Sequence, residues 1–111
     1  MFEKLDALEE RYDELGRLLV QPQVISDPEQ FKKNAKAHAA LEEIVSCYRE
    51  FKKVKRDLEE AKALLGEKLE AEFRELVMDE IDELEARKEE LERNLKLLLM
   101  PKDPNDEKNV I

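Results

Sequence analysis

The sequence lacks tryptophan and threonine, and its 111 residues include only two glycines and one cysteine. A single cysteine, Cys47, excludes an internal disulfide and fits a reducing compartment. Gly16 and Gly66 lie fifty residues apart, which excludes a glycine-rich phosphate-binding loop. The N-terminal residues form no long apolar run, so we expect neither a signal peptide nor a membrane span. These absences predict a cytoplasmic protein.

Charged residues dominate what is present. Asp, Glu, Lys and Arg make up 44% of the chain, and 29 acids against 20 bases give a net charge of −9. A chain of this size cannot form a deep globular core with so many charges, which favours long helices with charged outer faces. The negative charge also argues against general nucleic-acid binding.

Apolar residues recur every three or four positions, the period of a helix with one buried face. We predict three helices, at residues 2–20, 28–65 and 67–99, forming a helical domain over residues 1–100. Residues 21–25, which include Pro22, interrupt the period and should form a connector. Residues 101–111 contain Pro101 and Pro104 and should form a linker into a central domain that this fragment lacks.

The ends of the second helix carry local signals. Ser26 or Asp27 is the expected N-cap, and Pro28 suits the first turn, where its missing N–H costs little. Gly66 should end this helix in a left-handed conformation. The long helix is expected to carry one apolar stripe, with the following members: Phe31, Ala35, His38, Leu41, Val45, Tyr48, Phe51, Val54, Leu58, Ala61 and Leu65.

The third helix has a heptad seam, in which apolar residues alternate at spacings of four and three. Its members are Val77, Ile81, Leu84, Lys88, Leu91, Leu95 and Leu98, preceded by Leu69, Phe73 and Leu76, and Lys88 is the only polar one. Together the three helices predict an all-α, elongated antiparallel three-helix arm with coiled-coil-like packing. We expect the isolated arm to be monomeric.

No set of residues predicts catalysis or metal binding. His38 has no second histidine or cysteine nearby, so we expect a histidine of the core or its boundary. Cys47 lacks a neighbouring base, and the acidic residues of the third helix fit a solvated face rather than a metal site. The sequence therefore predicts no catalytic residue, metal, cofactor or small-molecule substrate.

A basic cluster in the long helix is the one candidate contact surface. Lys52, Lys53, Lys55 and Arg56 lie close together in a chain that is otherwise acidic. They would suit ribosomal RNA or an acidic protein surface. The alternative is that they face the third helix, where residues 67–99 hold twelve acids and six bases.

Three segments resemble the N-terminal domain of the bacterial release factor 1 family of class I peptide chain release factors. They are residues 24–31 (VISDPEQF), residues 48–53 (YREFKK) and residues 97–106 (LLLMPKDPND). The resemblance implies a role in translation termination at UAA and UAG codons, with the arm positioning the factor near the ribosomal stalk base. It implies ribosomal RNA and a stalk-base protein as partners, and no membrane.

The motifs that would carry chemistry in that family are absent. A Gly-Gly-Gln loop needs adjacent glycines, and a Pro-Xaa-Thr codon-reading segment needs threonine. We therefore expect no enzymatic activity from this chain alone. Two other functions stay open: a generic coiled-coil interaction or oligomerisation module, and the helical RNA-binding arm of an aminoacyl-tRNA synthetase.

Overall fold

The computed structural model describes residues 1–100, which fold into four helices. These are α1 (Phe2–Leu19), α2 (Pro22–Ile25), α3 (Pro28–Leu65) and α4 (Ala71–Leu99). No strand occurs within this range, so the predicted all-α class is confirmed. The predicted connector contains the single turn of α2. The predicted linker, residues 101–111, lies outside the described residues.

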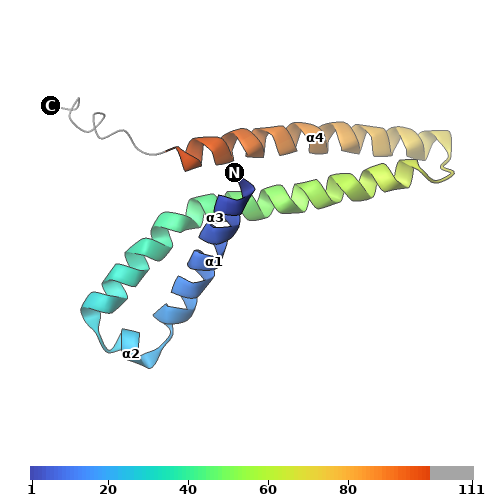
Figure 1. Cartoon of the computed structure of the whole chain (residues 1–111). Coiled ribbons are helices and arrows are strands. Elements are labelled where there is room, and N and C mark those ends of the chain that lie inside the picture. Colours follow the sequence, from blue (N-terminus) through green and yellow to red (C-terminus); the bar gives the residue numbers. More distant parts are fainter. Residues whose placement is uncertain (101–111) are drawn as a thin grey trace.

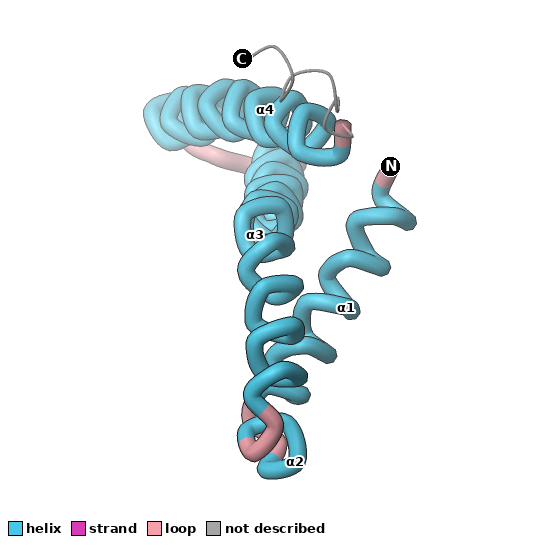
Figure 2. Tube along the Cα trace, turned by 90° about the vertical axis from the view of Figure 1, so that its left-hand side faces the viewer, coloured by secondary structure: helices cyan, strands magenta, loops and turns pink. Residues whose placement is uncertain are grey.

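Helix α3 is the central helix of an elongated molecule measuring 62 × 42 × 21 Å, and the other helices pack against it. Helix α1 packs along its N-terminal half and α4 returns antiparallel along its C-terminal half (Figure 1). Helix α3 changes direction near its middle, and the two hairpins diverge from there. Seen from the side, α1 and α4 lie against different parts of α3 (Figure 2). The arm therefore consists of two helical hairpins that share one helix.

The main apolar core lies where the two hairpins meet. Leu5 of α1 and Leu91 and Leu95 of α4 pack there against the middle of α3, which contributes Ile44, Val45, Tyr48, Phe51 and Val54. A second, smaller core joins the far ends of α3 and α4 through Leu58, Ala61, Val77 and Ile81. The predicted stripe and seam supply ten of these buried side chains, and most of their other members are half-buried. Phe31, Phe73 and Leu76 are exceptions, with exposed fractions of 42%, 48% and 66%.

The N-cap of α3 is Asp27, one of the two predicted residues. Its carboxylate accepts hydrogen bonds from the backbone N–H groups of Glu29 at 3.2 Å and Gln30 at 3.3 Å. These two donors have no partner within the helix, so the cap satisfies them. The start of α3 is thus set by local chemistry.

The predicted conformation at the end of α3 was wrong. Gly66 has φ −74° and ψ −12°, which is right-handed, and its N–H donates to the carbonyl of Ala63 at 3.1 Å. The third long helix was also predicted to start at residue 67, whereas α4 starts at Ala71. The intervening residues lie outside both helices because the chain reverses direction there to run back along α3.

Replacing Gly16 by alanine is expected to stabilise the protein. Gly16 lies inside α1, and an added Cβ would stand 3.5 Å from Nε2 of His38, an ordinary van der Waals distance. Alanine removes the entropic cost of glycine in a helix, so the free energy of unfolding should rise by about 0.5–1 kcal/mol. Urea unfolding followed by circular dichroism measures the change.

Gly66→Ala is the matched control. Gly66 follows the last residue of α3, and an added Cβ would stand 3.3 Å from the carbonyl oxygen of Ala63, a tight contact. This contact should offset the entropy that alanine removes from the unfolded chain, so the variant should change stability little. A loss of stability in Gly16→Ala would contradict the ordinary contact seen beside His38.

Candidate functional site

The four bases of the predicted cluster all lie on the surface of α3, but they differ in their partners. The Lys52 ammonium lies 2.6 Å from a carboxylate oxygen of Glu9 and 4.6 Å from the centroid of the Tyr48 ring. Lys52 is thus bound to α1. Lys53, Lys55 and Arg56 form no ion pair with any of residues 1–100.

No ion pair joins the cluster to the described part of α4, although the alternative was that the cluster faces this acidic helix. The ion pairs that join α3 to α4 are instead Glu50 with Arg87 and Lys62 with Glu85. Lys53, Lys55 and Arg56 therefore remain a charged surface available to an external partner.

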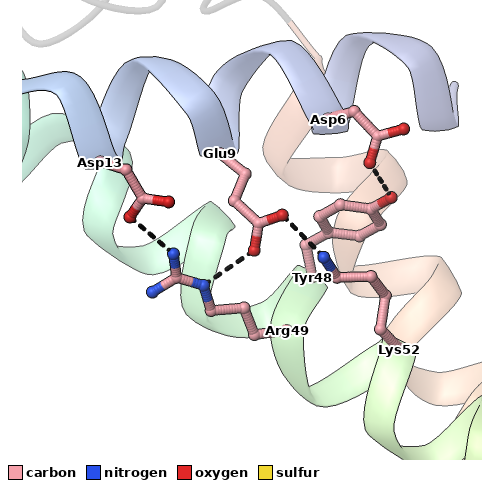
Figure 3. Close-up of polar contacts among 6 residues, drawn as sticks. All are labelled: Asp6, Glu9, Asp13, Tyr48, Arg49 and Lys52. Carbon is pink, nitrogen blue, oxygen red and sulfur yellow. Dashed lines mark hydrogen bonds and ion pairs between the residues drawn. The ribbon is translucent and has the colours of Figure 1, made fainter.

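Lys52 belongs to a polar network between α1 and α3 (Figure 3). Arg49 donates to Glu9 at 2.8 Å and to Asp13 at 2.7 Å, and the Tyr48 hydroxyl donates to Asp6. The acids come from successive turns of α1 and their donors from neighbouring turns of α3. This arrangement fixes how α1 is positioned along α3. Sequence reasoning missed the network, although three acids at helical spacing could have indicated it.

The network shifts the pKa values of Glu9, Tyr48 and Arg49. The hydrogen bond from Lys52 lowers the pKa of Glu9, and the bond to Glu9 raises the pKa of Arg49. Burial, together with the hydrogen bond to Asp6, raises the pKa of Tyr48 to about 12. Because the pKa of Glu9 is depressed, its pairing adds stability at neutral pH that is lost as the pH falls through that pKa.

The side chains of His38 and Cys47 each contact a neighbouring helix. The His38 ring stacks on Tyr12 with centroids 4.1 Å apart, which places it at the boundary between α1 and α3. The Cys47 thiol is half-buried and donates to the backbone carbonyl of Leu91 at 3.8 Å. Burial raises the pKa of this thiol, which lowers its thiolate fraction and its reactivity.

Residues 1–100 lack the features of a metal site and of a membrane-spanning helix. No group of three or more His, Cys, Asp or Glu side chains comes together there as a metal site would require. None of the helices combines the length and the apolar character needed to cross a membrane.

Residues 1–100 thus define a class of protein: an extended helical arm in which two hairpins share α3 and the exterior is charged. Residues 8–111 match the PCRF domain family, and the chain belongs to that family.

The chain is also similar to curated bacterial proteins over its whole length. It is 57% identical over its full length to peptide chain release factor 1 of Carboxydothermus hydrogenoformans and of a Geobacillus species. The same protein of Listeria welshimeri is 50% identical, again over all 111 residues. The chain spans 31% of the length of these curated relatives. The resemblance inferred from the three sequence segments is confirmed.

Proposed function

We propose that this chain is the N-terminal arm of a cytoplasmic class I release factor that acts in translation termination at UAA and UAG codons. The observation that carries the proposal is 57% identity to release factor 1 over the whole chain. In this role the arm positions the factor on the ribosome near the stalk base. It takes no part in peptidyl-tRNA hydrolysis itself.

The geometry of the arm suits such a role. A positioning element must hold its shape under load, and here both hairpins are fixed to one continuous helix by apolar cores and by cross-helix ion pairs. The competing oligomerisation function needs a free heptad seam. In the described part of α4, Val77, Ile81, Leu91 and Leu95 of that seam are buried within the chain.

Lys53, Lys55 and Arg56 are the proposed ribosome contact. Reversing all three to glutamate in the full-length factor should weaken ribosome binding roughly tenfold, because favourable charge pairs become repulsive. Lys52 is left intact, since its loss would also break the pair with Glu9. Ribosome affinity and the rate of peptide release are the measurements, with circular dichroism reporting the fold.

The control variant reverses Lys68, Arg74 and Arg93, three exposed bases outside the cluster. It makes the same change in net charge, so a purely long-range effect would weaken both variants equally. Equal losses of ribosome affinity in the two variants, or unchanged affinity of the first variant, would show that the cluster is not part of the interface. A full-length factor that neither binds ribosomes nor releases peptide would refute the proposed function as a whole.

A further inference from the structure

The turn that joins α1 to α3 carries a second surface that the predicted cluster does not include. We call it the basic tip and define it by Arg17, Lys32, Lys33 and Lys36 together with Val20, Ile25 and Phe31. It lies at the free end of the α1–α3 hairpin, around α2 (Figure 1). Residues 16–40 contain four bases and two acids in a chain whose net charge is −9.

The positive charge of the basic tip is not neutralised within residues 1–100. Arg17, Lys32, Lys33 and Lys36 form no ion pair there, whereas Arg49, Lys52 and Lys62 of α3 all do. Lys32 and Lys36 are four residues apart on α3, a spacing at which like charges repel and weaken a helix. The described part of the arm therefore uses none of these lysines in an ion pair between its helices.

Large apolar side chains are exposed in the same segment of the chain, between Arg17 and Lys32. Val20 is 73% exposed, Ile25 57% and Phe31 42%. Apolar side chains gathered on a surface and surrounded by charge are typical of a protein–protein interface, whose centre is apolar and whose rim is polar. Phosphate groups of RNA would use the lysines but leave the aliphatic side chains in water.

We infer that the basic tip binds an acidic protein surface with an apolar centre. The inference rests on the proposed function, because the partner is then a protein of the ribosome itself. The opposite end of the arm has the reverse charge, since residues 59–83 contain ten acids and three bases. An acidic partner is therefore attracted to one end of the arm and repelled by the other.

Site-specific photocrosslinking tests the inference. A benzophenone side chain replaces Ile25 in the full-length factor, and in a control variant it replaces Leu76, which is 66% exposed near the acidic end. Each variant is irradiated with purified 70S ribosomes. Adducts are then digested with ribonuclease or protease, and protein adducts are identified by mass spectrometry.

The expected result is a protein adduct from position 25 that survives ribonuclease, contains an acidic protein and exceeds the position 76 yield at least fivefold. Changing Lys32, Lys33 and Lys36 to glutamine should lower that yield at least fivefold, with an unchanged circular dichroism spectrum. Ribonuclease-sensitive adducts, a basic protein, equal yields at the two positions or no adduct would each overturn the inference.

Cosedimentation with ribosomes distinguishes failure of the inference about the basic tip from failure of the proposed function. A factor that cosediments but gives none of the expected adducts keeps its function and loses the basic tip as its contact. A factor that does not cosediment overturns both.

Discussion

Leu95→Ala is expected to lower the free energy of unfolding by about 3 kcal/mol, within the range measured for fully buried leucines. Leu95 is 0% exposed and lies in the central core, where α4 meets the middle of α3. The cavity cannot close easily, because two hairpins would have to move toward it together. Urea unfolding measures the loss, and the midpoint of thermal unfolding should fall by roughly 10–20 °C for a chain of this size.

Leu97→Ala is the control, because Leu97 lies two residues away on the same helix and is 66% exposed. Its effect should stay within about 0.5 kcal/mol, as for most surface substitutions. Similar losses in the two variants would mean that the central core does not hold α4 in place.

Alkaline pH is expected to destabilise the protein through Tyr48. Its pKa is raised from 10.0 to about 12, so the folded state keeps the phenol proton to a higher pH than the unfolded chain does. The folded state therefore binds more protons between these values, and stability falls as the pH rises from 10 toward 12. At about 1.4 kcal/mol per pKa unit, the loss should reach about 2 kcal/mol.

Comparing the natural protein with Tyr48→Phe at pH 8 and pH 11.5 isolates this effect from the titration of lysines. At pH 8 the variant should be less stable by about 1 kcal/mol, because the hydrogen bond to Asp6 is lost. Between the two pH values it should lose about 2 kcal/mol less than the natural protein. Tyr12→Phe keeps Tyr48 and should retain the full alkaline loss. An equal loss in the natural protein and Tyr48→Phe would rule out the shifted phenol.

The elements that sequence predicted well are those fixed by their own residues. Asp27 and Pro28 define the start of α3 wherever the rest of the chain lies, and the seam from Val77 to Leu95 needs only one partner helix. The start of α4 was missed because it depends on the reversal of the chain after α3. The conformation of Gly66 was predicted wrongly for another reason, because a glycine permits the left-handed conformation without requiring it.

The candidate site was predicted in part. A run of bases is visible in the sequence, but the position of α1 decides that Lys52 pairs with Glu9 while Lys53 does not. That position depends on side chains more than thirty residues apart, which no local pattern contains. The basic tip was missed because Phe31 fits the helical period and was expected inside, while Ile25 falls in the predicted connector, whose side chains no pattern places.

The central core also has a mechanical consequence. Leu98 and Leu99, at the end of α4, pack beside the middle of α3, and the two free ends of the arm lie on either side of that place (Figure 1). Helix α3 is continuous through its change of direction, so the central core, which contacts both hairpins there, sets the angle between the basic tip and the acidic end. A change in the packing of this core is expected to move one end of the arm relative to the other.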